Sequence, residues 1–358
     1  SATGMWDTFL MEWSGIVRML CPLPPLSIYP KVQPSAGDYG ICHEEFFGAN
    51  IPIRAVAADQ QASLFGQGCH YKGSLKCTIG TGAFVSLCTG NSCLASKYGL
   101  YPLVAWHLNG KNTFTLEGNT NSAGECIQWL VDLLGIKDIA QTSALANSVD
   151  SSNGVCFVNA FAGCSVPLFD PRARGMFIGL TASSTKAHMV RALLEGVAHN
   201  INQIINVIRT DTSLPISNLR VDGGASQNDF LCQKLADLTG MPVLRAQNHQ
   251  MTSVGTALLA GVGEGLWTVE EAHASAGTSK RFNPKMSKEQ RSREHANWLD
   301  AQKRTLGWSK DPGSTILTPM TYNALPQFMF SFQSILVLIS GVILTLLFSN
   351  CYPYTTYW

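Results

Sequence analysis

Short β-rich runs and longer helical runs alternate along the chain. The β-rich runs are 74–79 with 83–88, and 103–108 with 113–116. Each pair is joined by a turn containing glycine, Gly80-Thr81-Gly82 in the first and Asn109-Gly110 in the second, and such residues tolerate the backbone conformation of a tight turn. The pattern therefore predicts strand, tight turn, strand at both places.

The helical runs place apolar residues at three- and four-residue steps. The longest, 186–209, carries Val190, Leu193, Val197 and Ile201 on one face and predicts a core-facing helix. Other predicted helices are 7–19, 121–134, 228–238, 253–263 and 289–308, and further predicted strands are 155–160, 219–221 and 243–244. Strands that alternate with helices imply an α/β layered structure, with ligands expected at the carboxyl ends of the strands.

The two ends of the chain differ from its middle. Residues 1–50 contain the helix predicted at 7–19 and a proline-rich connection, and they lack the pattern of a complete domain. The sequence has no initiator Met and no signal peptide, so we expect it to begin partway through a longer protein. Residues 328–348, after a linker at 311–327, contain Gln333 as their only strongly polar residue and are long enough to cross a hydrocarbon core of about 30 Å. They predict a C-terminal hydrophobic helix that acts as a tail anchor; the alternative is an unusual splice product or reading frame.

The composition limits the classes of partner and the cellular compartment that we expect for this protein. The chain has 358 residues, 46% of them hydrophobic, so it can bury a sizeable core. Lys and Arg total 25 against 24 Asp and Glu, a formal charge of +1, and this balance provides no basic field for nucleic acid. The 11 cysteines show neither a C-x-x-C pair nor zinc-ligand spacing, which predicts reduced thiols in a cytoplasmic protein.

A polar group interrupts the apolar sequence at Asp59-Gln60-Gln61. The short apolar run 51–56 precedes this group, and small and apolar residues at helical spacing follow it. The pattern therefore predicts that one carboxylate lies at the start of a helix. One interpretation is a helix cap, favoured by the field of the helix N-terminus. The other is a general base flanked by two amides that can hold a polyhydroxylated substrate. The stretch alone leaves both open.

Two glycine turns directly follow predicted strands. Gly80-Thr81-Gly82 offers backbone N–H groups and a hydroxyl to a terminal phosphate, or is a plain hairpin turn. Asp222-Gly223-Gly224-Ala225 opens a predicted helix, where free N–H groups and missing side chains let a flat ring approach the backbone; its alternative is a tight turn between strand and helix. A short glycine pattern is a weak signal, so neither motif alone assigns a function.

Six co-linear blocks together resemble the FGGY carbohydrate kinase family, and within it the glycerol kinases and glycerol-kinase-like proteins. The blocks contain Asp59-Gln60-Gln61-Ala62; Gly80-Thr81-Gly82; Glu117-Gly118 with Ala123-Gly124 and Ile127-Gln128; Asp170-Pro171-Arg172-Ala173-Arg174-Gly175; Arg191-Ala192 with Glu195-Gly196; and Asp222-Gly223-Gly224-Ala225 with Asn228. The resemblance runs from about Trp6 to Trp267. It implies an actin-like, ribonuclease-H-like ATPase domain, the second domain of such a kinase.

The resemblance also implies a role for each matching residue. Asp59 corresponds to the catalytic base that takes the proton of the polyol's primary hydroxyl as this attacks the γ-phosphate of ATP, and it is the candidate ligand for Mg. Gln60 would hydrogen-bond the polyol, and Phe84 would pack on its carbon face. ATP would bind a phosphate loop at Gly80, Thr81 and Gly82, a ribose and phosphate site at Gly124, Ile127 and Gln128, and an adenosine pocket at Gly224, Ala225 and Asn228.

Parts of the family pattern are missing or changed. The first domain, with its N-terminal Asp-x-Gly phosphate loop, has no counterpart, because Asp38-Tyr39-Gly40 sits in a linker and not after a strand. We therefore expect 1–50 to be the last piece of the first domain plus a linker, and 51–310 to be the C-terminal kinase domain. Three substitutions beside the motifs leave the choice of polyol open: Ile79, Ala58 and Leu168.

The leading expectation is an ATP- and Mg-dependent kinase that converts glycerol to glycerol 3-phosphate in its full-length form, with little turnover from this chain alone. The rival is a membrane-tethered nucleotide-binding module without turnover. An Hsp70- or actin-like ATPase shares the architecture but does not account for the Asp59 motif or for 170–175. Apolar tails on family members that associate with mitochondria favour the mitochondrial outer membrane as the target of 328–348. The oligomeric state stays open, a homo-oligomer included.

Overall fold

The computed structural model describes residues 4–21 and 23–310, which fall into two compact units that separate after Pro25. In the smaller unit, β1 (Trp6–Asp7) pairs antiparallel with β2 (Glu12–Trp13), and α1 (Gly15–Leu20) follows. The helix predicted at 7–19 is therefore wrong over its first half, where the chain forms a hairpin.

Local side-chain contacts explain this hairpin. The Asp7 carboxylate accepts hydrogen bonds from the backbone N–H groups two and three residues further on, both at 2.9 Å, and so closes a turn. The rings of Trp6 and Trp13 meet edge to face with centroids 5.3 Å apart. Ser14 then caps α1. Aspartate and serine side chains that bond nearby backbone compete with a continuous helix, and here they win over the apolar periodicity.

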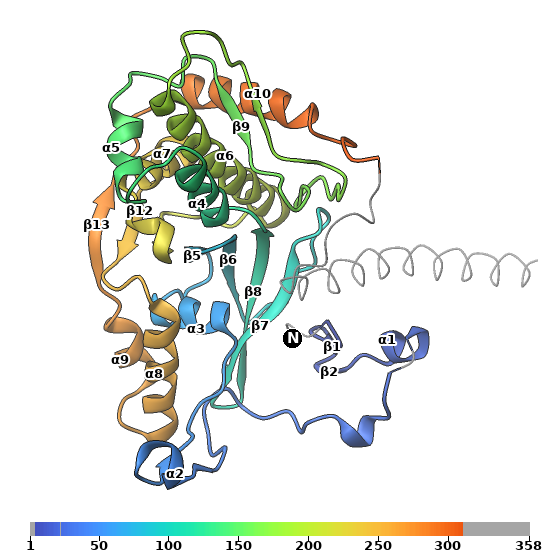
Figure 1. The fold of residues 1–358 in the computed structure, drawn as a ribbon. Coiled ribbons are helices and arrows are strands. Elements are labelled where there is room, and N and C mark those ends of the chain that lie inside the picture. Colours follow the sequence, from blue (N-terminus) through green and yellow to red (C-terminus); the bar gives the residue numbers. More distant parts are fainter. Residues whose placement is uncertain (1–3, 22, 311–358) are drawn as a thin grey trace, which may run out of the picture. The chain divides into compact units, whose positions relative to one another are not determined.

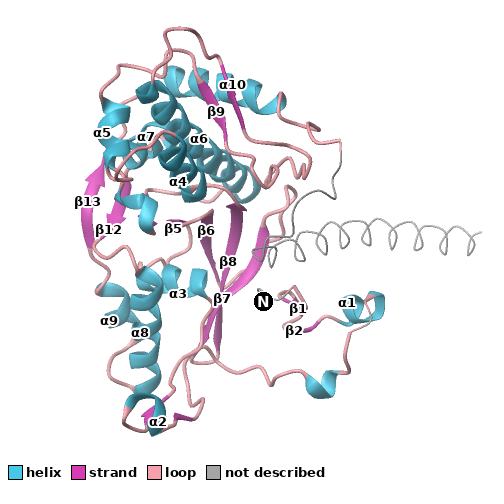
Figure 2. Cartoon of the chain, in the orientation of Figure 1, coloured by secondary structure: helices cyan, strands magenta, loops and turns pink. Residues whose placement is uncertain are grey.

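A seven-stranded mixed sheet organises the larger unit, with the strand order β13-β12-β11-β5-β6-β8-β7 (Figures 1 and 2). The strands are β5 (Leu75–Ile79), β6 (Ala83–Gly90), β7 (Tyr101–Leu108), β8 (Lys111–Thr120), β11 (Leu219–Asp222), β12 (Val243–Ala246) and β13 (Thr278–Phe282). β11 runs parallel to both β5 and β12, and the other pairs are antiparallel. The predicted α/β structure and the strands predicted for this sheet are confirmed; β13 was not predicted.

Helices pack against the sheet and against each other. They are α3 (Asp59–Gly66), α4 (Gly124–Leu133), α6 (Lys186–Thr212), α7 (Asp229–Thr239), α8 (Met251–Glu264) and α10 (Lys288–Lys303). Shorter elements are η1 (Leu26–Ile28), α2 (Glu44–Phe47), α5 (Gln141–Asn147), η2 (Gly224–Gln227), α9 (Val269–Ala274) and the strand pairs β3 (Ile41–Cys42) with β4 (Ile51–Pro52) and β9 (Cys156–Val158) with β10 (Met176–Ile178). All the longer predicted helices after residue 120 are present.

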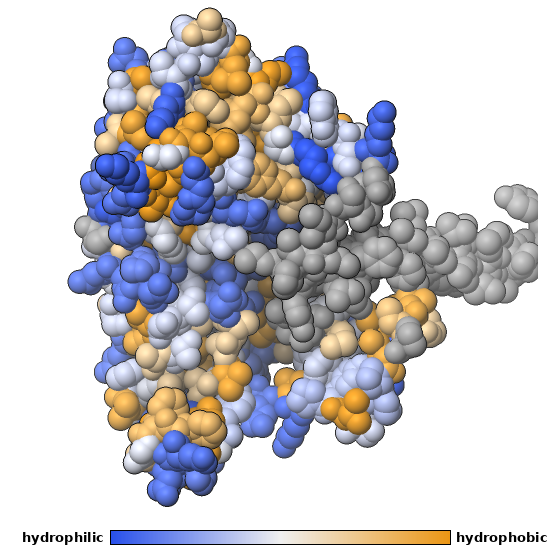
Figure 3. All heavy atoms as spheres, in the orientation of Figure 1, coloured by the Kyte–Doolittle hydropathy of each residue, from blue (hydrophilic) through white to orange (hydrophobic). Residues whose placement is uncertain are grey.

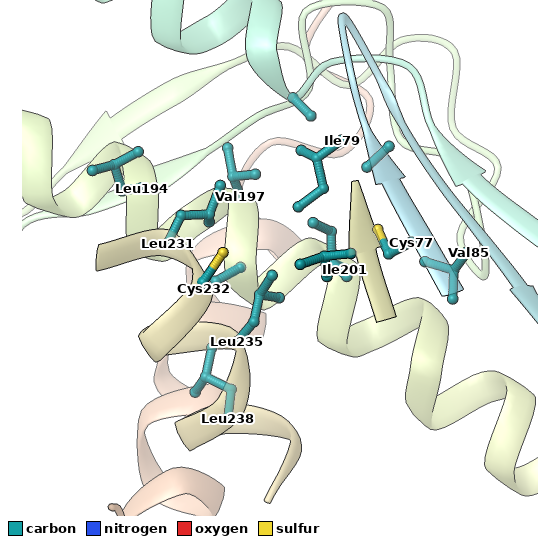
Figure 4. Close-up of a cluster of buried hydrophobic side chains, with 14 of the residues drawn as sticks. Cys77, Ile79, Val85, Leu194, Val197, Ile201, Leu231, Cys232, Leu235 and Leu238 are labelled. Carbon is teal, nitrogen blue, oxygen red and sulfur yellow. The ribbon is translucent and has the colours of Figure 1, made fainter. Parts of the chain in front are cut away.

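The side chains of β5 alternate between two environments. Leu75, Cys77 and Ile79 point into the large apolar core, where α6 and α7 supply most of the facing side chains (Figure 4). Lys76 and Thr78 lie on the opposite face, which α3 covers. Because side chains alternate with a period of two along a strand, the sheet has one apolar and one polar face at this point.

Helices α3 and α8 approach each other through glycine. A Cβ atom added to Gly255 of α8 would lie 1.8 Å from the backbone oxygen of Ala62 on α3. One added to Gly66 of α3 would lie 2.7 Å from the backbone oxygen of Met251 on α8. Real carbon atoms never come so close to a carbonyl oxygen, so the position of α3 on the sheet depends on these two glycines.

A histidine is buried where α9 meets α3. His273 is 5% exposed, and its ring lies against Phe65, with ring centroids 4.3 Å apart, and stacks on His70 at 4.0 Å. Burial lowers the pKa of His273 from its ordinary value of 6.5 to about 4. The imidazole therefore stays neutral in the folded protein through the mildly acidic range.

This histidine should make stability depend on pH. Between pH 6.5 and about 4 the unfolded chain binds a proton at His273 that the folded chain does not, so stability falls as pH falls. From pH 7.5 to pH 5 we expect His273 to contribute a loss of about 2 kcal/mol in the free energy of unfolding, measured by urea titration. His273→Phe should remove this contribution, and His43→Gln, at an exposed histidine, should not. Equal pH dependence in wild type and His273→Phe would contradict the assignment.

The described residues bear on two further predictions, the membrane anchor and the reduced cysteines. Within residues 4–21 and 23–310, no helix has the length and apolar character needed to span a bilayer. The predicted linker at 311–327 and the predicted anchor at 328–348 lie outside the described residues. Among the described residues, no two cysteines form a disulfide with each other.

Candidate active site

The two glycine turns lie at one edge of the sheet. β5 and β11 are parallel neighbours with Thr78 opposite Asp222, so the loops that leave their carboxyl ends begin side by side. Gly223 has φ +85°, and a Cβ atom there would lie 2.5 Å from the backbone oxygen of Ile79. Only glycine fits this approach, which brings the Asp222-Gly223 turn against the start of the Gly80 turn.

The turn at 80–82 also holds the start of α4. The backbone N–H of Gly124 donates to the oxygen of Gly80 at 2.9 Å, and that of Ala123 donates to the oxygen of Thr81 at 2.8 Å. A Cβ atom on Gly124 would lie 2.4 Å from the Gly80 oxygen. These contacts bring the predicted phosphate loop and Gly124 together. The N–H groups at the start of α4 are used by the loop, while the side chain of Thr81 is exposed.

Asp59 is the first residue of α3 and does not occupy its N-cap position. The N-cap position is Ala58, which has no side chain to bond the helix. The exposed Asp59 carboxylate accepts from the backbone N–H of Gln60 at 2.8 Å through one oxygen and from the Gln60 amide nitrogen at 3.3 Å through the other. Asp59 is thus not the N-cap residue, although its carboxylate does bond one free N–H of the first turn, and it still has lone pairs for another partner.

Contacts through α8 tie Asp59 to the glycine turns. The N–H of Gly223 donates to the backbone oxygen of His249 at 3.0 Å, just before α8 begins. One turn later Thr252 donates through its hydroxyl to the backbone oxygen of Asp59 at 3.3 Å. The start of α3, the start of α8 and the Asp222-Gly223 turn therefore form one neighbourhood at the edge of the sheet.

A hydrogen-bonded network on the polar face connects the two predicted ligand regions. Lys76 donates through its ammonium to the Gln60 side-chain oxygen and, at 2.8 Å, to the Thr78 hydroxyl. Thr78 donates to Asp222 Oδ1 at 2.6 Å, and Ser63 donates to Asp222 Oδ2 at 2.8 Å. The network runs from the amide beside Asp59 to the carboxylate before Gly223.

Phe84 and a buried acid extend this polar face. Phe84 on β6 is half-buried and pairs across the sheet with Thr78, so the predicted polyol-packing ring lies beside the network. Ser86 pairs with Lys76 on one side and with Glu117 on the other, and its hydroxyl donates to Glu117 at 2.7 Å. Burial raises the pKa of Glu117, and the charge of Lys76 opposes this.

The predicted ribose and adenosine residues have mixed surroundings. The side chain of Ile127 lies in the apolar core, whereas Gln128 is exposed and donates to Asp132 at 2.8 Å. Asn228 caps α7 and donates through its amide to Thr142 at 2.9 Å. Both Asn228 contacts hold the polypeptide chain, so any contact with a nucleotide would use its remaining bonding capacity.

The turn after β11 differs from the prediction in one detail. Gly224 and Ala225 do not open the α-helix directly but begin the 3₁₀-helix η2, and α7 starts only at Asp229. Ala225 is half-buried against the core, while Gly224 is exposed with no atom within 4 Å of an added Cβ. The open space beside Gly224 is where the sequence predicts the adenosine pocket.

The described residues offer Mg²⁺ no preformed cage. Among them, no group of three or more His, Cys, Asp or Glu side chains is arranged to hold a metal ion. Asp59 is an exposed carboxylate whose backbone is tied through α8 to the Gly223 turn. Mg²⁺ bound through one carboxylate, several waters and substrate phosphates needs no more than this, so Asp59 fits the predicted role of ligand.

The sequence prediction missed the buried network between the motifs. Lys76, Thr78 and Ser63 were given no role, although they connect the predicted residues. One signal was present, since a lysine in the middle of the short strand Leu75-Lys76-Cys77-Thr78-Ile79 is unusual once both faces of the strand are covered. That α3 covers this face of β5 is a feature of the tertiary structure, and the residue pattern of one strand does not predict it.

Comparison with known proteins agrees with this arrangement. Residues 75–264 match the C-terminal domain of the FGGY family of carbohydrate kinases. Glycerol kinase 5 of Danio rerio is 40% identical over 319 residues, covering 87% of this chain and 60% of that protein. Glycerol kinase 2 of Thermotoga maritima is 41% identical over 312 residues, covering 87% of this chain and 63% of that protein. The chain thus spans about three fifths of the length of these relatives.

Solved structures share the fold. A crystal structure of Plasmodium falciparum glycerol kinase with ADP superposes with a TM-score of 0.77 at 29% identity, over 84% of this chain and 61% of that one. A xylulose kinase from Rhodospirillum rubrum, at 23% identity and a TM-score of 0.69, shares the fold over 84% of this chain and 62% of its own. The order of motifs, the sheet topology and the family match lead to one conclusion: the chain belongs to the FGGY family of carbohydrate kinases and carries the C-terminal domain of that family.

Proposed function

We propose that this protein takes part in ATP-dependent phosphorylation of glycerol to glycerol 3-phosphate. One observation carries the proposal. The exposed carboxylate of Asp59 is held in the same neighbourhood as the Gly80 and Gly223 turns, in a chain about 40% identical to proteins named glycerol kinase. A proton acceptor close to two glycine turns at a sheet edge suits the transfer of a phosphoryl group to a hydroxyl.

In this proposal Asp59 handles the proton. The primary hydroxyl of glycerol gives its proton to the carboxylate while its oxygen attacks the γ-phosphorus of ATP, and the bond to the bridging oxygen of ADP breaks. Gln60 donates to a polyol oxygen from beside Asp59, and Phe84 covers the carbon face. Positioning and charge stabilisation provide most of the rate in such a transfer, so the protein needs little covalent chemistry of its own.

The nucleotide side of the site uses backbone more than side chains. Gly80, Thr81 and Gly82 would receive the terminal phosphates, with the exposed Thr81 hydroxyl as a donor. Gly224 and Ala225 leave room for the adenosine ring, and Gln128 is exposed on α4 near the phosphate loop. When bound, Mg²⁺ would neutralise charge on the phosphates, with Asp59 as its protein ligand.

The domain assignment is part of the same proposal. Residues 51–310 would form the C-terminal kinase domain, and 1–50 the end of the first domain with its linker, as the coverage of the longer relatives suggests. Exposed aromatic side chains support a further contact surface, because Phe46 and Phe47 on α2 are 72% and 71% exposed. Figure 3 shows apolar surface at the end of the larger unit where Figure 1 places α2. Such patches often mark places where another domain packs.

Polyol-dependent ADP formation tests the proposed function. We expect the chain to bind Mg-ATP measurably and to form ADP slowly, faster with glycerol than with xylulose or gluconate. The product should be glycerol 3-phosphate, identified by ³¹P NMR. ADP formation that does not respond to any polyol would contradict the proposal and favour a plain ATPase.

A further inference from the structure

We propose that Lys76 is a positioning residue of the candidate polyol site. Its buried ammonium fixes the side-chain amide of Gln60 so that the amide nitrogen, and not the oxygen, faces Asp59 and the polyol. The orientation of Gln60 stands on the structure alone, and only the identity of the ligand rests on the proposed function.

The first observation is the burial of Lys76. Its side chain is fully buried in the middle of β5, on the face that α3 covers. Lysine is almost never fully buried unless it is paired. Yet the hydrogen bonds of this ammonium go to two neutral side chains, Gln60 and Thr78. Holding a cation there costs free energy, which a purely apolar residue in the same place would avoid.

The second observation is the direction of each hydrogen bond. An ammonium has three donors and no acceptor, so Gln60 must turn its carbonyl oxygen towards Lys76. The other end of the amide is the NH₂ group, and it lies 3.3 Å from Asp59 Oδ2. A flipped amide would place NH₂ against the ammonium and a carbonyl oxygen against the Asp59 carboxylate. Both contacts would be repulsive, so the charge of Lys76 selects one orientation.

The third observation is that Lys76 is itself held in place. Thr78 donates its hydroxyl proton to Asp222 at 2.6 Å, so its oxygen is left to accept from the ammonium. Asp222 is in turn held by Ser63 at 2.8 Å. The side chains of Asp222 and of the buried Glu117 lie on the same face of the sheet as the ammonium. The ammonium therefore has little freedom, and neither does the amide it holds.

This orientation has a consequence for substrate choice. A group bound between Gln60 and Asp59 must accept from the Gln60 nitrogen and donate to the Asp59 carboxylate. A hydroxyl does both, and the proton it donates is the one that a general base would remove. A carbonyl or ether oxygen accepts but has no proton to give. Lys76 thus biases the site towards hydroxyl groups, from a position that touches no substrate.

The orientation can be tested without any ligand. In ¹⁵N-labelled full chain, the side-chain amide signal of Gln60 is assigned as the one lost in Gln60→Glu. In Lys76→Met we expect this signal to shift and its ¹⁵N relaxation to report a more mobile side chain. The matched control is Lys234→Met, at a lysine that is 7% exposed and paired with Glu195 and Glu294 on other elements. An unchanged Gln60 signal in Lys76→Met would overturn the proposal.

The functional consequence is tested through a double-mutant comparison of glycerol affinity. Lys76→Met should weaken glycerol binding about 10-fold, as expected when the hydrogen bond from Gln60 to the polyol is lost, and change Mg-ADP binding less than about 3-fold. In a Gln60→Ala background, Lys76→Met should have no further effect on glycerol. Equal losses in both backgrounds would mean that Lys76 acts only on the fold, and would overturn the proposal.

A second variant covers the case in which Lys76→Met does not fold. Gln60→Glu keeps an oxygen for the ammonium, turns the contact into an ion pair and removes the NH₂ donor. A carboxylate oxygen then faces Asp59 in place of the NH₂ group, so we expect its glycerol affinity to fall about 10-fold. Unchanged glycerol affinity in this variant would overturn the proposal. If wild type binds no glycerol at all, the proposed function fails, while the amide signal still decides the role of Lys76.

Discussion

Replacing Asp59 by asparagine is expected to lower kcat for glycerol phosphorylation about 10²- to 10⁴-fold, the usual range for loss of a general base. Asparagine keeps the shape of the side chain and can still meet the backbone N–H of Gln60, so the fold should survive. What disappears is the proton acceptor. The measurement is glycerol-dependent ADP formation at saturating ATP and glycerol, in the longest form of the protein that turns over.

The matched control for this variant is Asp38→Asn. Asp38 is also an exposed carboxylate, but it pairs with Arg54 at 2.8 Å and belongs to a different part of the unit. Its loss should leave kcat within about 2-fold, since a surface ion pair contributes little. A kcat for Asp59→Asn as high as that of Asp38→Asn would remove Asp59 from the mechanism and leave the two glycine turns as a nucleotide site without a base.

The sequence predicted the elements that depend on local pattern. The hairpin around Gly80-Thr81-Gly82 and the long helix α6 follow from glycine positions and from apolar periodicity, and both are present. The short elements α5, α9, β10 and β13 were missed because six or seven residues, or fewer, carry too little periodicity to detect. At 7–19 the apolar spacing was misleading, since Asp7 closes a turn where a helix was expected.

The candidate site was predictable only as a set of motifs. Asp59, Thr81 and Gly223 were identified individually, but their common neighbourhood depends on β5 lying next to β11 and on α8 starting beside both. Strand order is not contained in the spacing of residues along the chain. The role of Lys76 depends in addition on α3 covering the polar face, which is why a lysine that looks solvent-facing in the sequence is buried in the fold.

The network also explains why the base sits on α3 at all. Ser63 is one turn after Asp59 on the same helix and donates to Asp222, immediately before the Gly223 turn. Helix α3 thus carries Asp59 at the polyol end of the site and Ser63 at the nucleotide end. The distance between the base and the Gly223 turn is therefore set by a rigid helix. A loop in this position would allow the two ends to move independently, at a cost to the alignment that phosphoryl transfer requires.

That rigidity predicts a large effect from one methyl group far from the chemistry. Gly255→Ala places a Cβ atom 1.8 Å from the backbone oxygen of Ala62, and a backbone atom cannot rotate away as a side chain can. Helices α3 and α8 must move apart. Alanine gains about 1 kcal/mol in helix propensity, but overpacking against backbone should exceed the usual 1–3 kcal/mol. We expect a net loss of about 2 kcal/mol or more in the free energy of unfolding, measured by urea titration.

The same change should reach the site, because α3 carries Asp59 on its first turn. We expect Gly255→Ala to raise the KM for glycerol as well as to lower stability. Gly37→Ala is the control: no atom lies within 4 Å of a Cβ added there, and its backbone does not have positive φ. It should be neutral in both measurements. If Gly255→Ala were as stable as Gly37→Ala, the close contact between α3 and α8 would not exist in solution, and the position assigned to Asp59 would lose its main support.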